Sequence, residues 1–257
     1  MTDENAAGNE SQYHLELSPG DIRGPVLLPG DPDRLSTITG FWETAAEVAN
    51  HREFRTVSGT VGNTAIAATS TGIGSPSAAI AVEELANIGV DTLIRVGSCG
   101  AIQPGISLGD LIITTGAVRQ EGTSHEYVRE TYPAVAHHRV VTALISAADE
   151  LGYPYHVGIT CSTDSFYSGQ NRSGHGGYTG ITSEEQFKEL QQAGVLNYEM
   201  EASAILTLAS LFGMRAGAVC AVYANRTSGE FAPRGEDRAA ETAAKAVEIL
   251  ADMDGHI

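Results

Sequence analysis

Two arginines that could bind an anion stand beside glycine-containing turns in the first hundred residues. Arg95 lies inside the apolar run LIRVG, where burying a permanently charged guanidinium without an anionic partner would cost several kcal/mol. Arg34 follows the turn PGDPD, where backbone amides at a helix start and a guanidinium can together hold a small oxyanion. The structural alternative pairs Arg95 with a buried carboxylate and Arg34 with Asp31 or Asp33. We favour a binding site for a small anion.

A second group of polar and aromatic residues lies in the loop FYSGQNR, which follows an expected strand. Phe166 and Tyr167 offer aromatic faces, while Gln170 and Arg172 offer a side-chain amide and a guanidinium. Such a set can stack on a flat heterocycle and hydrogen-bond to its edge. Packing of the two rings in the core at a strand end is the alternative.

Two acids flank a methionine in the motif NYEMEAS. Glu199 and Glu201 could accept hydrogen bonds from the hydroxyls of a sugar diol, and Met200 could supply an adaptable apolar contact. Acids are also ordinary in the first turn of a helix, where they interact with its dipole. The motif is expected to open a helix that runs to about Phe212.

The elements that must position these residues are alternating strands and helices. Residues 69–102 predict a strand–turn–helix–strand unit, which is typical of parallel sheets, and ligands of such sheets collect at the carboxyl ends of the strands. Strands are expected at Pro25–Leu28, at the end Ala65–Ala68, and at Thr92–Val96, Gly109–Ala117, Val157–Cys161 and Ala216–Ala224. Turns are expected at Thr71–Ser77 and Gly97–Gly100, and helices at Ala78–Ile88, Ala134–Glu150 and Asp237–Met253.

Length and composition indicate one domain in a reducing compartment. The chain has 257 residues, which suits a single large α/β domain over residues 13–257 behind an acidic tail at residues 1–12. No run approaches the ~20 apolar residues of a membrane span. The three cysteines have no pairing or zinc-ligand spacing. We therefore expect a cytoplasmic protein without a structural metal.

The surface charge is strongly negative. A formal net charge of −17 with only two lysines, Lys188 and Lys245, argues against nucleic acid as a partner, because phosphate backbones need a basic surface. At molar salt the Debye length falls to ~3 Å and screens the self-repulsion. The charge favours a salt-adapted protein, with an ordinary acidic cytosolic protein as the alternative.

Several motifs together resemble one enzyme family. The run TGIGSPSAAIAVEEL, with PGDPDR, HREF, FYSGQNR, NYEMEAS and NRT, resembles the uridine-cleaving members of the nucleoside phosphorylase-I family, from about His14 to the last helix. The resemblance implies a single α/β domain whose central mixed sheet curls partly into a distorted barrel flanked by helices. It also implies a pentosyltransferase that uses inorganic phosphate to convert uridine to uracil and ribose 1-phosphate, without a required cofactor. A homohexamer with active sites shared between subunits is implied as well.

The resemblance assigns roles to individual residues. Arg95, Gln170 and Arg172 would be catalytic. Phosphate would be held by Gly30, Arg34, Arg95 and Ser98, with Arg52 from a neighbouring subunit. Ribose would be held by Met200 and Glu201, with Glu199 nearby and His14 from the neighbour. The base would contact Phe166, Gln170, Arg172, Tyr223 and Ala224. A potassium ion could lie between subunits at Glu53, Ile73 and Ser77.

Some positions depart from the family pattern, and other functions remain open. Ser98 replaces a usual threonine, and Tyr223 with Ala224 replaces an apolar pair. A purine nucleoside phosphorylase of the same family is one alternative, although related purine enzymes place an aspartic acid near the position of Asn225. A non-catalytic nucleoside-binding protein is another. A dinucleotide-binding oxidoreductase is disfavoured because Ser77 replaces the third glycine of its motif, and a nucleoside hydrolase would not need the phosphate-binding arginines.

Overall fold

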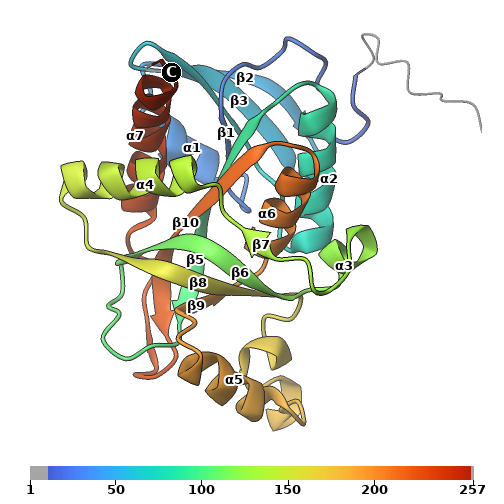
Figure 1. Cartoon of the computed structure of the whole chain (residues 1–257), viewed down its shortest axis with the longest axis vertical. Coiled ribbons are helices and arrows are strands. Elements are labelled where there is room, and N and C mark those ends of the chain that lie inside the picture. Colours follow the sequence, from blue (N-terminus) through green and yellow to red (C-terminus); the bar gives the residue numbers. More distant parts are fainter. Residues whose placement is uncertain (1–10, 256–257) are drawn as a thin grey trace, which may run out of the picture.

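The structure is a computed structural model that describes residues 11–255. The chain forms one mixed sheet flanked by helices, with α1, α4 and α7 on one side and α2 and α6 on the other (Figure 1). This confirms the expected α/β fold. Residues 1–10 of the predicted acidic tail lie outside the described residues, whereas Gln12 is bound to the domain, because its side chain accepts a hydrogen bond from Asn87 at 3.0 Å.

The elements alternate along the chain as follows. The strands are β1 (Val26–Leu28), β2 (Thr44–His51), β3 (Phe54–Val61), β4 (Thr64–Thr69), β5 (Thr92–Ala101), β6 (Leu111–Gln120), β7 (Ala134–Val135), β8 (Tyr155–Thr163), β9 (Asn197–Glu199), β10 (Arg215–Asn225) and β11 (Glu230–Phe231). The α-helices are α1 (Arg34–Thr39), α2 (Ser75–Asn87), α3 (Thr123–Tyr127), α4 (His138–Leu151), α5 (Ser183–Gln192), α6 (Ala202–Leu211) and α7 (Glu236–Gly255). Two 3₁₀ turns, η1 (Ser168–Gln170) and η2 (His175–Gly177), lie between β8 and α5.

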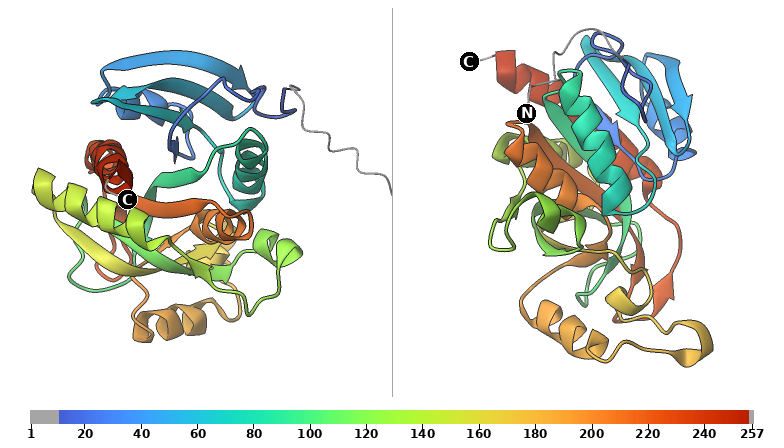
Figure 2. Two further views of the ribbon diagram at one scale, coloured as in Figure 1. Left: turned by 45° about the horizontal axis from the view of Figure 1, so that its top comes forward. Right: turned by 90° about the vertical axis from the view of Figure 1, so that its right-hand side faces the viewer.

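Five strands of the sheet close into a distorted barrel. β10 pairs with β6, β6 with β8, β8 with β9, β9 with β5, and β5 again with β10. The sheet then continues from β5 through β1, β4, β3 and β2 as an open extension, which forms the upper layer in the left view of Figure 2. Because β1, β4, β5 and β10 run parallel, their carboxyl ends meet at one edge.

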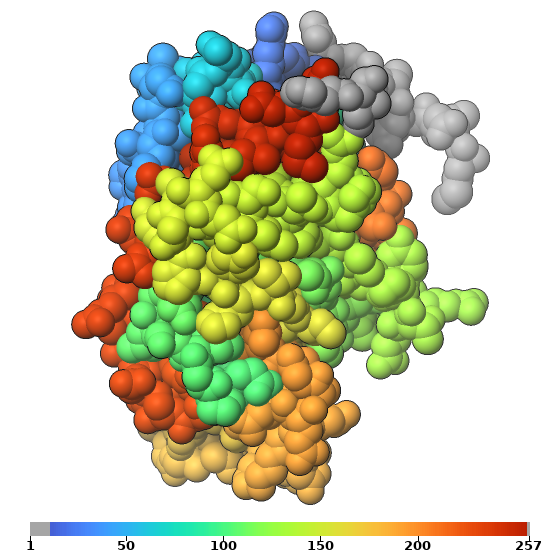
Figure 3. Space-filling model, turned by 60° about the vertical axis from the view of Figure 1, so that its left-hand side comes forward, coloured from blue at the N-terminus to red at the C-terminus, as the bar shows by residue number. Residues whose placement is uncertain are grey.

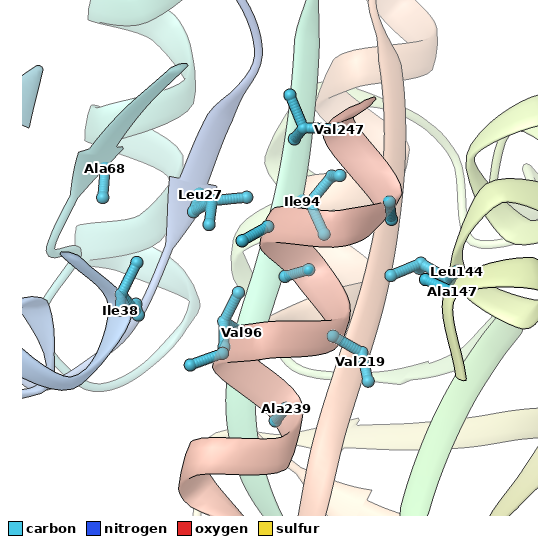
Figure 4. Close-up of a cluster of buried hydrophobic side chains, with 14 of the residues drawn as sticks. Leu27, Ile38, Ala68, Ile94, Val96, Leu144, Ala147, Val219, Ala239 and Val247 are labelled. Carbon is cyan, nitrogen blue, oxygen red and sulfur yellow. The ribbon is translucent and has the colours of Figure 1, made fainter. Parts of the chain in front are cut away.

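Small side chains let the helices approach the sheet closely. Val219 of β10 and Ile94 of β5 pack against Val247 and Ala239 of α7 (Figure 4). α4 lies beside α7, and Figure 3 shows both on one face of the molecule. A Cβ on Gly217 would lie 2.5 Å from Val140 Cγ1 of α4, so glycine is required where α4 crosses β10.

The structure corrects the turn expected at Gly97–Gly100 and the starts of several predicted helices. The turn expected at Gly97–Gly100 is part of β5, which runs without interruption to Ala101. The helix expected from Ala134 begins only at His138, because residues 134–135 form β7 and pair with β6. The helix expected from Glu199 begins at Ala202, and Glu199 ends β9.

Gly97 explains the first of these errors. A Cβ at this position would lie 2.9 Å from Arg95 Nη2 and 3.0 Å from Cys220 Sγ. The glycine therefore makes room for the Arg95 side chain within a strand rather than for a turn.

The turn expected at Thr71–Ser77 ends at Gly74, because α2 begins at Ser75 rather than at Ala78. The glycines of this turn adopt a conformation that other residues avoid. Gly72 and Gly74 have φ of +72° and +96°, which other residues rarely adopt. Within residues 11–255, no helix is both long enough and apolar enough to cross a membrane.

Candidate active site

A cavity of about 410 Å³ lies at the carboxyl ends of β1, β5 and β10. Its lining contains most of the candidate residues that one subunit was expected to supply to its own site. Asp31, Cys99, Gly100, Tyr198 and Phe231 also line it. The predicted residues in its lining are Gly30, Arg34, Ile73, Arg95, Ser98, Phe166, Gln170, Arg172, Glu199, Met200, Glu201, Tyr223 and Ala224. The expected edge of the sheet is therefore the edge that carries the site.

Arg95 is buried between two carboxylates. Its side chain is 5 % exposed, its Nε donates to Glu199 Oε2 at 2.8 Å, and its Nη2 pairs with Glu201 Oε2. Burial alone would lower the pKa of Arg95, but the charges of Glu201 and Glu199 raise it above its ordinary value. The buried Nη1 has no hydrogen-bond partner in the described chain. Arg95 is therefore paired with buried carboxylates, as the alternative to anion binding proposed, and its Nη1 still offers a donor to a ligand.

Glu199 and Glu201 have different surroundings. Glu199 Oε2 also accepts hydrogen bonds from the backbone N–H groups of Glu201 and Ala202 at 2.8 Å each, and Oε1 accepts the hydroxyl of Ser162. The oxygens of Glu201 accept the Gly74 N–H, at 2.6 Å, and a backbone hydrogen bond from Met200, and Oε2 pairs with Arg95. Burial raises the pKa of Glu201, and Glu199 adds to the shift, whereas Arg95 opposes it. Glu201 is therefore the acid with acceptor capacity left for a ligand.

Arg34 lines the same cavity as Arg95 and contacts Ser98. Its Nη2 donates to Ser98 Oγ at 3.0 Å. Its ion pair is with Glu236, at 3.3 Å, rather than with Asp31 or Asp33. Because Gly30, Arg34, Arg95 and Ser98 share the cavity wall, they form a cationic, donor-rich end suited to an oxyanion.

Another part of the cavity wall is aromatic and carries a guanidinium without an anionic partner in the described residues. The guanidinium carbon of Arg172 lies 4.4 Å from the centre of the Phe166 ring. Its Nε is buried without a hydrogen-bond partner in the described residues, and burial lowers the pKa of Arg172. Gln170 is 3 % exposed beside it. A half-buried guanidinium without an anionic partner in the described residues favours a ligand that carries or develops negative charge.

Arg226, which follows β10, holds this loop in place. It donates to the backbone carbonyls of Gln170 and Asn171 at 2.8 and 2.9 Å. The side chain of Asn225 also forms hydrogen bonds within the chain. Its NH₂ group donates to the carbonyls of Gln103 and Ile106, and its oxygen accepts from the Thr227 N–H. Asn225 does not line the cavity.

Tyr223 reaches the cavity from a β-bulge. The pairing between β5 and β10 shifts between Val222 and Ala224, and a bulge of this kind redirects the side chain of the extra residue. The Tyr223 hydroxyl donates to Glu236 Oε2 at 2.5 Å. Burial, followed by this hydrogen bond, raises the pKa of Tyr223.

His14 and Arg52 lie outside the cavity of their own chain. His14 Nδ1 lies 2.7 Å from Glu84 Oε1, and the Arg52 guanidinium lies 5.6 Å from the ring of Tyr13. The two residues share one surface because Tyr13 also contacts the His14 ring. Within one chain, therefore, neither residue completes the site.

The three residues expected to hold a cation lie around one turn. A Cβ on Gly72 would meet Glu53 Cγ at 2.9 Å and Ser77 Oγ at 3.3 Å. The Ser77 hydroxyl donates to the carbonyl of Ile73 at 3.2 Å. Carboxylate, carbonyl and hydroxyl oxygens suit a hard cation, so the donor set fits potassium.

Sequence reasoning missed Phe231 and Glu236. Phe231 pairs with Ala224 through β11 and is 70 % exposed at the cavity. It could have been noticed as an aromatic residue in a polar loop. Glu236 carried no signal, because Arg34 is about two hundred residues away in the sequence.

The cavity combines three chemical environments. Arg34 and Arg95 supply cations, Glu201 supplies a carboxylate, and Phe166 with Arg172 supplies an aromatic face beside a guanidinium. Together these groups can bind an oxyanion, a diol and a flat heterocycle in one cavity.

Comparisons with known proteins agree with this chemistry. The family model described as "Phosphorylase superfamily" matches residues 26–252. A uridine phosphorylase of Thermococcus kodakarensis is 57 % identical over 95 % of this chain and 88 % of its own length. A uridine phosphorylase of Escherichia coli is 41 % identical over 93 % of this chain and 95 % of its own length. A guanosine phosphorylase of Halorubrum lacusprofundi is 39 % identical over 85 % of each chain.

Proposed function

The chain belongs to the phosphorylase superfamily, and on that premise we propose that it cleaves uridine with inorganic phosphate to give uracil and ribose 1-phosphate. The observation that carries the proposal is Arg172, which stacks on Phe166 with a buried Nε that has no partner in the described residues, in the same cavity as Arg34 and Arg95. The names of two relatives, uridine phosphorylases with 57 % and 41 % identity, support the choice of nucleoside.

The proposed reaction needs charge stabilisation at both ends of the breaking bond. As the N-glycosidic bond breaks, the sugar gains positive charge and the base negative charge. Phosphate held by Arg34 and Arg95 stabilises the sugar and then bonds to C1′. Arg172, together with Gln170, stabilises the charge on uracil. Fixed charges of this kind are usually the largest catalytic contribution, and no covalent enzyme intermediate is needed.

A panel of nucleosides tests the choice of base. Uridine, deoxyuridine, thymidine, inosine, guanosine and adenosine are incubated with the enzyme, with and without phosphate, and the products are separated by chromatography. We expect uridine to be cleaved fastest and only with phosphate. Gln170 can accept a hydrogen bond from N3–H and donate to a carbonyl oxygen, and Arg172 can bind the other oxygen.

The relative named guanosine phosphorylase makes a purine nucleoside the second candidate. Against it, the Asn225 amide is bound to backbone carbonyls and has no acidic proton to give to a purine nitrogen. Faster cleavage of guanosine or inosine than of uridine would overturn the assignment of the base.

We further propose a homohexamer in which each active site is completed by His14 and Arg52 of a neighbouring subunit. The position of both residues on one surface away from their own cavity supports this sharing. Closed symmetric assemblies of this kind are common for soluble enzymes.

Hybrid oligomers test the sharing of sites. Arg52→Ala and Arg95→Ala chains are each expected to be nearly inactive, because each lacks one phosphate contact. After subunits are mixed, some sites receive both wild-type arginines, so activity is expected to return to about a quarter of wild type at most. Mass spectrometry verifies that hybrids form. Hybrids without activity would contradict shared sites.

A cytoplasmic location, a potassium ion at Glu53, Ile73 and Ser77, and adaptation to salt complete the proposal. The net charge of −17 supports the last of these, because self-repulsion weakens as salt screens it. The thermal midpoint is expected to rise between millimolar and molar potassium chloride. Sodium chloride serves as the control for the specific ion, and a flat or falling midpoint in both salts would contradict salt adaptation.

A further inference from the structure

Glu236 contacts the cationic end of the cavity but has no part in the reaction described above. It is the first residue of α7. Its Oε2 lies 3.3 Å from Arg34 Nε and accepts the Tyr223 hydroxyl at 2.5 Å. Its Oε1 accepts the hydroxyl of Thr37 at 3.2 Å. One carboxylate thus joins α1, β10 and α7.

These contacts fix the guanidinium of Arg34 from three directions. Glu236 holds its Nε edge, Ser98 accepts from Nη2 at 3.0 Å, and the Tyr223 ring lies 5.6 Å from its carbon atom. A planar guanidinium recognises an oxyanion through the direction of its N–H groups as well as through its charge. Its orientation therefore matters for binding.

Tyr223 connects this arrangement to the other half of the site. It is the bulged residue of β10, next to Ala224, and both line the cavity. Its hydroxyl is the donor to Glu236, so the position of its ring depends on that carboxylate.

We propose that Glu236, together with Tyr223, is a positioning residue that holds Arg34 in the orientation that binds phosphate. The inference rests on the proposed function, because it takes the oxyanion of the cavity to be the phosphate substrate. Glu236 acts through Arg34 and touches no substrate.

Simple electrostatics predicts the opposite result. Removing a negative charge near a phosphate site should strengthen phosphate binding. Glu236 is 37 % exposed, however, so solvent screens its charge. Loss of the orientation is therefore the larger effect, and the sign of the change separates the two explanations.

The first experiment uses full-length Glu236→Gln and Glu236→Ala enzymes. Phosphate binding is measured by calorimetry, and kcat and KM are measured for phosphate and uridine. Both variants are expected to bind phosphate about tenfold more weakly, with kcat at saturating phosphate within about twofold of wild type. Tyr223→Phe is expected to weaken phosphate binding by about threefold, because the ring loses its anchor.

Glu241→Gln is the matched control. Glu241 also lies in α7 and accepts a tyrosine hydroxyl, that of Tyr153, whereas the described side-chain contacts of Arg34 are with Ser98, Glu236 and Tyr223. Its phosphate affinity is expected to equal that of wild type. A loss equal to that of Glu236→Gln would mean that any such change in α7 acts through stability, and would overturn the proposal.

The second experiment asks whether Glu236 acts through Arg34. In an Arg34→Ala background, adding Glu236→Gln is expected to change phosphate affinity by less than about twofold, because the residue to be positioned is gone. Additive losses, or tighter phosphate binding by Glu236→Gln, would overturn the inference. Failure of the proposed function appears separately, as an absence of uracil formation by the wild-type enzyme, while calorimetry still reports the anion. A wild-type enzyme that binds no phosphate would overturn both.

Discussion

Replacing Arg172 with alanine is expected to lower kcat for uridine about 10²- to 10³-fold while changing phosphate affinity by less than about twofold. The guanidinium of Arg172 stacks on Phe166 and has a buried Nε without a partner in the described chain. Its anionic partner is expected only when the base gains charge on the way to the transition state. Initial rates at saturating phosphate and phosphate calorimetry measure the two quantities.

Arg129→Ala controls for the loss of one positive charge. Arg129 is an exposed arginine on the segment after α3, and it does not line the cavity. Its turnover is expected to equal that of wild type. Equal losses of kcat and phosphate affinity in Arg172→Ala would mean that Arg172 belongs to the phosphate end, and the assignment of the base pocket would then be wrong.

Replacing Arg95 with alanine is expected to abolish measurable phosphate binding, to cut kcat/KM for phosphate at least about 10³-fold, and to destabilise the fold by about 3–5 kcal/mol. The variant leaves Glu199 and Glu201 buried together without their cation. Chemical denaturation and steady-state kinetics measure the two effects.

The stability of Arg95→Ala is expected to depend on pH because of the buried acids Glu199 and Glu201. The pKa of Glu201 is already raised by burial and by Glu199, with Arg95 opposing the shift, so removing Arg95 raises it further. A carboxyl whose folded-state pKa exceeds its unfolded value stabilises the fold below the unfolded pKa, and that stability is lost as pH rises through the folded pKa. The thermal midpoint of Arg95→Ala is therefore expected to rise relative to wild type as pH falls from about 8 to about 5.

A second substitution separates folding from catalysis. Arg95→Ala combined with Glu201→Gln removes one of the two buried charges and is expected to recover part of the lost stability without recovering activity. An Arg95→Ala enzyme that is folded and has unchanged phosphate kinetics would remove Arg95 from the site.

The sequence predicted the layout of the fold because its strands and helices have clear local patterns. It predicted the strand–turn–helix–strand unit from residue 69 onwards, and the structure contains β4, the glycine turn, α2 and β5 in that order. It failed where a contact between distant residues decides the local structure. Gly97 reads as part of a turn, yet it lies within β5 because Arg95 and Cys220 occupy the space that a Cβ would need.

The site shows the same division. The individual candidates could be recognised from their chemistry and from the family resemblance, and most of them line one cavity. The different surroundings of Glu199 and Glu201 could not be predicted from the sequence. They depend on the hydroxyl of Ser162 and on backbone N–H groups that bind Glu199. The pairing of Arg34 with Glu236 rather than Asp31 or Asp33 depends on how α7 packs against α1.

The central claim is that this cavity transfers a pentosyl group from uracil to phosphate, and phosphorus NMR of the reaction mixture tests it most directly. Uridine and inorganic phosphate are incubated with the wild-type enzyme, and uracil is quantified in the same sample. We expect one ribose 1-phosphate to appear for each uracil released and for each inorganic phosphate consumed. Uracil released together with free ribose while the phosphate signal stays constant, or no uracil at all, would contradict the account.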